Sequence, residues 1–426
     1  MASGSEHETI RALSDELVEL QRPIRILNSV SWSDEIEADF FARGAKEQPK
    51  VDASYYQQHR TLGYDPGELR NALRVLSERV RDQLGSAPIA DLMCRRLADY
   101  RGVIKMLEVR GTPSFTQHSA ELYGGVGDEL HEGGPTLASL GELMRDALNS
   151  IDSGVWEPPE DREHSAEAAV QILQDRLASL CGADQVIIKL DDGIVADAAA
   201  GSNYIKLRQG AQFSERDLRV LEVHEGWVHV ATGLNGRAQP VCTFLSKGTP
   251  ATTVTQEGLA VFTEITTLSS TPERLRKITR RIRGIAMAND GATFLDVYRW
   301  LIDEGLDQDD SWASTVRVFR GSTPTSGPFT KDLVYSRGFI EVYDTIRLAV
   351  RRGLLDRLPL LFIGKISVHE LGALAQLAEQ GLIEPAAILP PNISDVSALA
   401  SWMAFSNLLN RIDLDTMEAH LSSALD

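Results

Sequence analysis

The sequence has few cysteines. Only Cys94, Cys181 and Cys242 occur among 426 residues, and no two of them have the CxxC spacing. Three scattered thiols support neither a disulfide framework nor a zinc site made of cysteine ligands. We therefore expect buried, reduced thiols.

Basic charge and long apolar runs are also scarce. The 61 Asp and Glu residues outnumber the 43 Lys and Arg residues, so the net charge is −18. This charge argues against nucleic acid as a general partner, because a phosphate backbone would be repelled. No apolar run approaches the roughly 18 residues that a membrane span needs. No basic segment followed by an apolar core begins the chain, so we expect a cytoplasmic protein.

One pattern stands out, His224-Glu-Gly-Trp-Val-His229, which reads HExxxH. It lies near the end of an amphipathic run over residues 213–233. Ser214 suits the N-cap of a helix there and Gly233 suits the C-cap. We predict that both histidines lie on this one helix.

The spacing of five between the histidines needs an irregular helix. Residues five apart diverge by roughly 140° around a regular α-helix, so no single ion could hold both imidazoles. A one-residue π-bulge would bring them to the same side, since i to i+5 is its own repeat. Gly226, inside the motif, is the residue that would most easily permit such a bulge.

A second short helix is predicted over residues 252–264, with Thr253 or Thr255 as its cap. It carries Glu257, which lies 28 positions after His229 (257 − 229). This separation lets one helix end, the chain reverse and another helix pack beside the first. Two histidines and a carboxylate then form the ligand set of a catalytic zinc, with the fourth position left for water.

Glu264 competes with Glu257 for the role of third ligand. It lies seven residues further along, which is two helical turns. It could bind the metal, or it could be an acid that contacts one of the ligands. The sequence leaves both open.

Three short strands are predicted before the histidine helix, over residues 185–191, 194–200 and 204–208. Asp192-Gly193 and a turn at 201–203 separate them. A small sheet that runs into the histidine helix would offer an edge strand with which an extended peptide could pair. This arrangement fits a peptide substrate.

The two motifs together, HEGWVH and Gln256-Glu-Gly-Leu-Ala260, resemble the QEGLA-motif family of bacterial proteins, often labelled as modulating flavohaemoglobin expression. That family is similar to the eukaryotic microtubule-associated tyrosine carboxypeptidases. The resemblance implies a zincin-like metallopeptidase domain. In this domain His224, His229 and Glu257 would bind zinc, and Glu225 would be the general base.

A carboxypeptidase also needs groups that hold the free end of its substrate and stabilise the oxyanion of the transition state. The segments 317–321 and 329–338 supply cations and a phenol. We predict Arg320 or Lys331 as the partner of the substrate carboxylate, and Tyr335 as the oxyanion donor.

The predicted fold class is α+β, with a small mixed sheet in a zincin-like domain surrounded by helices. Residues 1–150 form a helical N-terminal region, which includes helical apolar spacing over 66–84 and 88–107. Residues 151–355 form the catalytic domain, and the helical residues 356–426 pack on it.

The stretch 272–283 is strongly basic but contains no aromatic residue. We interpret it as a helix with a solvated face, or as one that lies against acidic parts of the same protein.

We expect a zinc-dependent carboxypeptidase that acts on the C-terminus of a peptide or protein. A dipeptidyl peptidase is an alternative, because HExxxH also occurs in such enzymes, although there an EExxxE-like helix supplies the third ligand. A regulatory or interaction protein with a structural metal site is another alternative. Structural zinc sites are richer in cysteine, so the lack of cysteine near His224 favours catalysis.

Overall fold

Helices form most of the structure, a computed structural model that describes residues 4–151, 161–182, 184–192, 194, 197–413 and 417–418. The helices of the N-terminal half are α1 Gly4–Gln21, α2 Ile26–Val30, α3 Asp34–Ala42, α4 Ala53–His59, α5 Pro66–Leu84, α6 Pro88–Glu108, α7 Ser114–Tyr123, α8 Leu137–Asn149 and α10 Ala166–Cys181. The strands are β1 His164–Ser165, β2 Ile187–Asp191, β3 Ala198–Ala200, β4 Tyr204–Arg208 and β5 Gln212–Phe213.

The second half of the chain is almost entirely helical. Its elements are α11 Glu215–Leu221, the π-helix η1 Glu222–Val230, α12 Ala231–Ala238, the 3₁₀ helix η2 Thr243–Ser246, α13 Pro250–Thr266, α14 Pro272–Asn289, α15 Phe294–Asp303, α16 Gln308–Phe319, the 3₁₀ helix η3 Thr330–Leu333, α17 Val334–Arg352, the 3₁₀ helices η4 Leu355–Phe362 and η5 Val368–Glu370, α18 Leu371–Glu379, α19 Pro391–Ser394 and α20 Val396–Leu409.

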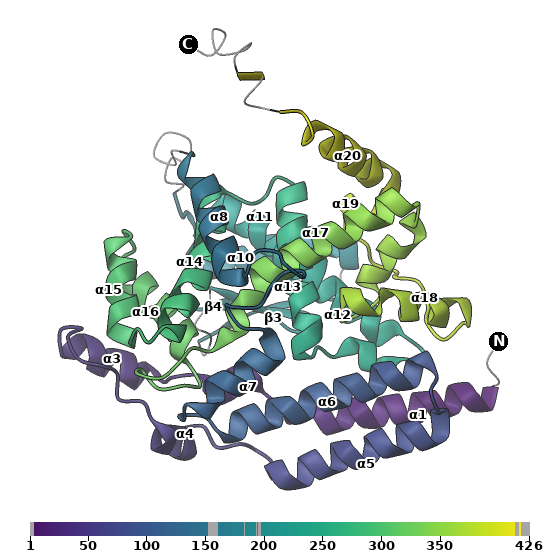
Figure 1. The fold of residues 1–426 in the computed structure, drawn as a ribbon, viewed down its shortest axis with the longest axis horizontal. Coiled ribbons are helices and arrows are strands. Elements are labelled where there is room, and N and C mark those ends of the chain that lie inside the picture. Colours follow the sequence, from purple (N-terminus) through teal and green to yellow (C-terminus); the bar gives the residue numbers. More distant parts are fainter. Residues whose placement is uncertain are drawn as a thin grey trace.

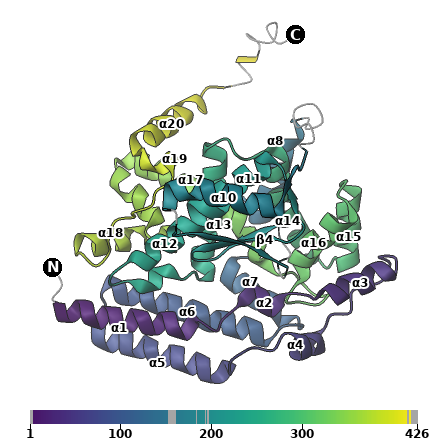
Figure 2. The ribbon, with the colours of Figure 1, turned by 180° about the vertical axis from the view of Figure 1, so that it is seen from behind.

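The N-terminal helices α1, α5 and α6 lie side by side along one edge of the molecule (Figures 1 and 2). Helices α5 and α6 both begin at a proline, as the sequence predicted. Helix α5 buries Leu73, Leu76 and Val80, whose spacing of three and four places them on one face. These helices are therefore held by a shared apolar seam.

The structure contains the three predicted strands in one of two small sheets; β4 has the predicted bounds, whereas β2 and β3 are shorter than expected. One sheet has the order β2-β4-β3, in which β2 is parallel to β4 and β3 is antiparallel to it. The other pairs β1 with β5. The first sheet is thus mixed, and the α+β class agrees with the structure. Residues 195 and 196 of the strand predicted over 194–200 lie outside the described residues.

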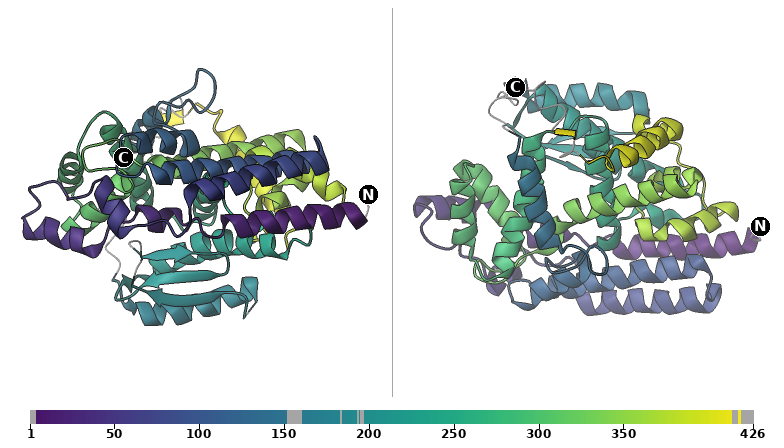
Figure 3. Two further views of the ribbon diagram at one scale, coloured as in Figure 1. Left: turned by 90° about the horizontal axis from the view of Figure 1, so that it is seen from below. Right: turned by 45° about the horizontal axis from the view of Figure 1, so that its top comes forward.

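Helix α10 and the π-helix pack with the mixed sheet around one apolar core. This core includes Leu173 and Leu177 of α10, Ile205 of β4 and Val223 of the π-helix. In the left view of Figure 3 the sheet and an adjoining helix lie at the lower edge, outside the N-terminal helices. The sheet therefore supports the π-helix directly.

Helices α13 and α17 cross at very short distance in the centre of the molecule. A Cβ atom added at Gly258 of α13 would lie 2.0 Å from the carbonyl carbon of Gly338 in α17, and one added at Gly338 would lie 1.9 Å from the carbonyl oxygen of Val254. Only glycine fits at both positions. The glycine of the QEGLA motif therefore serves helix packing.

Apolar residues from both ends of the chain share one cluster. It includes Ile10 and Leu13 of α1 together with Leu374 of α18 and Met403 of α20. The domain boundary expected near residue 151 adjoins residues 152–160, which lie outside the described residues, so the three-part division stays a prediction. No helix of the described chain is long and apolar enough to cross a membrane.

Candidate metal centre

The helix that carries HEGWVH changes its hydrogen-bond period within the motif. It begins as α11, which Ser214 caps as predicted, in a reciprocal pair with Asp217. It then continues as the nine-residue π-helix η1 and returns to α-helix in α12. The prediction of a one-residue bulge was too small, because the π-helix spans the whole motif.

Gly233 does not end this helix, so its predicted role as C-cap was wrong. The helix continues to Ala238. A Cβ atom at Gly233 would lie 2.5 Å from the carbonyl oxygen of Ser202, in the turn between β3 and β4. Close approach of this turn, rather than a left-handed cap, explains the glycine.

The π-helix brings both imidazoles to one side. The ring centroids of His224 and His229 lie 4.8 Å apart, with the rings nearly perpendicular. The side chain of His224 is buried and that of His229 is half-buried. Gly226 lies between them, where a Cβ atom would come within 2.3 Å of Leu177 in α10. This glycine therefore also lets the π-helix pack closely on α10.

Helix α13 supplies the third side chain. Its N-cap is Thr249, followed by Pro250 in the first turn, so the prediction of Thr253 or Thr255 as cap was wrong. The helix begins earlier than expected because proline fits the first helical position, where no amide donor is needed. Glu257 lies seven residues after Pro250 (257 − 250), which is about two turns into the helix.

One oxygen of Glu257 faces both histidines. Its Oε2 lies 3.4 Å from Nε2 of His224 and 3.5 Å from Nε2 of His229. The three ligand atoms lie within 4.8 Å of one another. Ligand atoms of a tetrahedral zinc, about 2.0–2.2 Å from the metal, are roughly 3.3–3.6 Å apart. The two distances from Glu257 therefore fit a zinc ion.

The same oxygen lacks a hydrogen-bond partner. Oε2 of Glu257 is buried, and it accepts no hydrogen bond from the described residues. Buried carboxylate oxygens without a donor are rare, because the desolvation of a charged group is costly. A metal ion at this point would satisfy the oxygen, so this donor set fits a divalent metal with an affinity for nitrogen and oxygen ligands.

Glu264 lies behind His224. Its Oε1 is 2.6 Å from Nδ1 of His224, on the ring nitrogen opposite the one that faces Glu257. This contact fixes the ring and leaves Nε2 for a metal, an arrangement that is common among histidine ligands. Arg274 in α14 donates to both oxygens of Glu264, at 3.0 and 3.1 Å. The geometry therefore places Glu264 in contact with His224, outside the group that His224, His229 and Glu257 form.

These contacts shift the pKa values of all three groups. Burial would lower the pKa of His224, but the adjacent carboxylates of Glu257 and Glu264 raise that pKa to about 10. Burial would raise the pKa of Glu264, but Arg274 and His224 lower it to about 2. The Lys331 ammonium and both histidines hold the pKa of Glu257 well below its ordinary value against the effect of burial. Without a metal, His224 is therefore the cation that compensates two carboxylates.

Glu225, next to His224, reaches the mixed sheet. Its Oε2 accepts a hydrogen bond of 3.0 Å from the backbone amide of Ala200 in β3. Strand β3 is an edge strand, and Ala200 pairs with Ile205 of β4 on its other side. The half-buried carboxylate of Glu225 is thus held between the π-helix and the edge of the sheet.

Two of the three predicted substrate groups lie at this centre. The ammonium nitrogen of Lys331 is 3.5 Å from Oε1 of Glu257, and the ring of Tyr335 stacks beside His224 with centroids 6.5 Å apart. Arg320 is buried against the ring of Phe329 and has no described contact with the three metal-site residues.

The structure gathers more cations around Tyr335 than the predicted Arg320 and Lys331. Arg281 of the basic helix α14 lies 4.4 Å from the centre of the Tyr335 ring. Arg317 of α16 binds both oxygens of Asp332, at 2.6 and 3.1 Å, and Arg281 lies 3.8 Å from the same carboxylate. The interpretation that the basic stretch lies against acidic parts of the protein is confirmed. The cluster could not be found from sequence because α14, α16 and η3 each supply part of it.

Lys365 is another residue at the centre that no motif indicates. Its ammonium nitrogen bonds to the backbone carbonyl of His229 at 2.7 Å. Burial lowers its pKa to about 7, while Glu257 and Glu225 oppose this shift. The residue lies more than 100 positions after the second motif, so only the fold brings it to the site.

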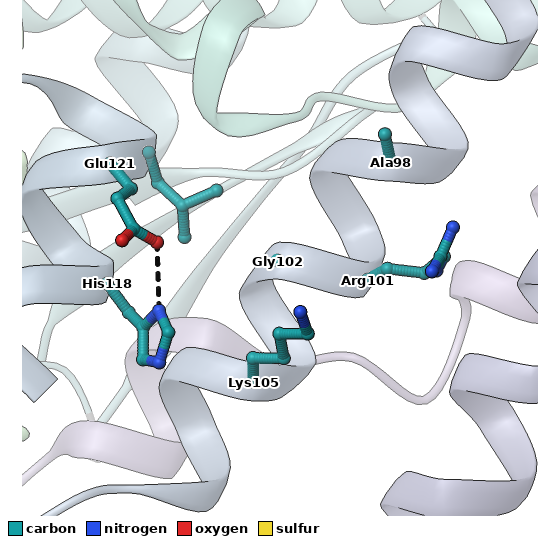
Figure 4. A pocket seen from close by; sticks show the side chains of 7 residues that line it. Ala98, Arg101, Gly102, Lys105, His118 and Glu121 are labelled. Atoms are coloured by element: carbon teal, nitrogen blue, oxygen red, sulfur yellow. Dashed lines mark hydrogen bonds and ion pairs between the residues drawn. The ribbon is translucent and has the colours of Figure 1, made fainter. Parts of the chain in front are cut away.

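The described cavities lie elsewhere. One of about 250 Å³ separates α6 from α7, where His118 and Glu121 form an ion pair opposite Arg101 and Lys105 (Figure 4). A more open groove of about 1150 Å³ runs beside α4 and the loop 323–325. Neither is lined by the three residues of the metal centre.

Comparison with known families agrees with the geometry. A model of the family described as microtubule-associated tyrosine carboxypeptidase matches residues 38–411. The chain belongs to this family. No curated protein matches the sequence. Membership supports a carboxypeptidase type of activity, while the narrower resemblance to QEGLA-motif proteins stays a prediction.

Proposed function

We propose that the protein is a zinc-dependent carboxypeptidase that removes residues from the C-terminus of a peptide or protein. The observation that carries the proposal is the buried Oε2 of Glu257, which accepts no hydrogen bond from the described residues and lies 3.4 Å from Nε2 of His224 and 3.5 Å from Nε2 of His229. Family membership supports the carboxypeptidase activity. The sheet beside a helix with two histidines is consistent with a zincin-like domain.

Zinc held by His224, His229 and Glu257 would supply Lewis-acid chemistry, polarising a carbonyl oxygen and acidifying a water molecule. Glu225 then acts as the general base that takes a proton from water and later passes it to the leaving amine. The amide of Ala200 orients this carboxylate. The free edge of β3 lies beside it, where an extended substrate could pair with the strand.

The cations around Tyr335 suit the terminal carboxylate of a substrate. Arg317 is matched by Asp332, whereas Nε of Arg320 and Nη1 of Arg281 are buried and bond to none of the described residues. Lys331 reaches Glu257 at 3.5 Å. A bound anion would compensate this excess of buried positive charge. In our proposal Arg320 or Lys331 binds the carboxylate, and the Tyr335 hydroxyl stabilises the oxyanion.

The test is cleavage of a peptide library by the purified, zinc-loaded protein, with products identified by mass. Because the family is named for a tyrosine carboxypeptidase, peptides that end in tyrosine are included, together with the same peptides amidated at the C-terminus. We expect loss of C-terminal residues from free acids only, abolished by chelator and reduced about 10²- to 10⁴-fold in Glu225→Gln.

Two outcomes would contradict the proposal. Release of N-terminal dipeptides would favour the dipeptidyl peptidase, and a stoichiometric metal without any cleavage would favour a regulatory protein. Equal cleavage of free and amidated peptides would remove the role of the cationic cluster in binding the carboxylate.

A further inference from the structure

One ammonium group joins the two helices that carry the metal site. Nζ of Lys365 donates to the carbonyl oxygen of His229 at 2.7 Å, to Oε1 of Gln256 at 2.8 Å and to Oγ1 of Thr232 at 3.0 Å. A lysine ammonium has three protons, and these three acceptors use all of them. Among the described residues no carboxylate bonds to this ammonium, so its hydrogen bonds join the end of the π-helix and the start of α12 to α13.

The contact determines the orientation of Gln256. An ammonium is a donor only, so the side-chain atom that faces Lys365 must be the amide oxygen. Oγ1 of Thr232 lies 2.8 Å from the same oxygen. Gln256 directly precedes the ligand Glu257, and its side chain is buried. Lys365 thus fixes the turn of α13 from which this ligand projects.

On the other side, Lys365 contacts the π-helix where the hydrogen-bond period changes. The π-helix ends at Val230, and α12 begins at the next residue. In this turn the carbonyl of His229 accepts from Lys365, and the carbonyl of Val228 accepts from Thr232 at 2.6 Å. Side chains therefore bond to backbone carbonyls at the point where a π-helix must return to an α-helix.

The loop that carries Lys365 is itself held firmly. Its amide donates to the carbonyl oxygen of Leu245 at 2.7 Å, and its carbonyl accepts from the buried Arg96 at 2.9 Å. A Cβ atom at the preceding Gly364 would lie 2.6 Å from the same Leu245 oxygen. The ammonium therefore projects from a rigid support, which a positioning role requires.

We propose that Lys365 is a positioning residue that sets the distance between the ligands His229 and Glu257 by tying the end of the π-helix to the first turns of α13. The inference rests on the proposed zinc site and adds to it a residue that touches neither metal nor substrate. Loss of the ammonium leaves each helix free to shift against the other, so the site binds metal more weakly.

The test compares zinc affinity and the visible absorption of the cobalt-substituted protein, which reports ligand geometry. Lys365→Met keeps the length of the side chain and removes the ammonium. We expect about 10- to 100-fold weaker zinc binding and an altered cobalt spectrum. Lys247→Met is the matched control, because Lys247 is another lysine whose pKa burial lowers, and no described contact joins its ammonium to the site. It should retain the affinity and spectrum of the wild type.

A second variant, Gln256→Met, removes the acceptor on α13 and should act through the same link. The double variant should then bind zinc about as weakly as either single variant. Additive losses, or a wild-type affinity and spectrum in Lys365→Met, would overturn the inference. If Lys365→Met fails to fold, the same criteria apply to Gln256→Met. Wild-type protein that binds no zinc would instead overturn the proposed function.

Discussion

The two helices that meet at the metal centre are held in opposite ways. The π-helix is irregular, and groups from other elements hold it in place. Glu264 contacts the ring of His224, the amide of Ala200 donates to Glu225, and Lys365 donates to the carbonyl of His229 near the end of the helix. Helix α13 is regular, has its own cap and packs on α17 with almost no space between backbones. The comparison teaches that polar contacts with other elements position the π-helix, whereas close packing positions α13 in addition to its contact with Lys365.

The packing of α13 should be the least tolerant feature. In Gly258→Ala the new Cβ would overlap the backbone of Gly338, which cannot move aside as a side chain can. We expect a loss of at least about 3 kcal/mol in the free energy of unfolding, measured by denaturant titration.

The control is Gly372→Ala in α18, where an added Cβ has no atom within 4 Å. It should be neutral or stabilise by up to about 1 kcal/mol, because alanine favours helix more than glycine. If Gly258→Ala were as stable as the wild type, the close crossing would not exist.

On the polar side, Glu264→Gln removes the charge that holds Nδ1 of His224. We expect about 10- to 100-fold weaker zinc binding, measured by competition with a chromophoric chelator. Glu273→Gln, in the first turn of α14, removes an acid whose ion pair with Arg280 is on the surface, and should leave the affinity unchanged. Equal affinity in Glu264→Gln and wild type would mean that Glu264 does not support the ligand.

The packing of the π-helix on α10 should be more forgiving than that of α13. In Gly226→Ala the new Cβ meets the end of the Leu177 side chain, which can rotate. We expect a loss of about 1–2 kcal/mol in unfolding free energy. Leu177→Ala leaves a cavity, and the double variant should lose less than the sum of both, which a double-mutant cycle would measure. Strict additivity would show that the two residues do not meet.

The smallest effect concerns pH. In metal-free protein the pKa of His224 is about 10, above its ordinary 6.5. Because this pKa is raised in the folded state, protonated His224 adds to the free energy of unfolding. The contribution is fully present below pH 6.5 and is lost as the pH rises through about 10. We therefore expect the melting temperature of chelator-treated protein to fall by a few degrees from pH 6.5 toward 10, and His224→Asn to lack this part of the fall. Identical pH profiles for both would contradict the shift.

The motif residues could be predicted because their chemistry is local. Two histidines five residues apart can bind one ion only if the helix has a π-type irregularity, so His224, His229 and this irregularity were predicted together. Glu257 was predicted from the second motif. The length of the π-helix did not follow, since α10 and Lys365 help to stabilise it.

Residues that several elements assemble could not be predicted. Arg274 was visible only as part of a basic stretch, and its contact with Glu264 depends on where the first turn of α14 lies relative to the end of α13. The cap of α13 was misplaced because three threonines follow Thr249 within six residues, and each could cap a helix. The two glycines at the crossing with α17 are likewise explained only by the tertiary contact.

The most direct measurement of the central claim is X-ray absorption spectroscopy of the zinc-loaded protein, combined with zinc titration of His224→Ala, His229→Ala and Glu257→Gln. We predict one zinc per chain with two nitrogen ligands and carboxylate and water oxygens at about 2.0–2.2 Å, and a large loss of affinity in each variant. Stoichiometric zinc that remains bound with unchanged affinity in all three variants would place the metal elsewhere and contradict the account.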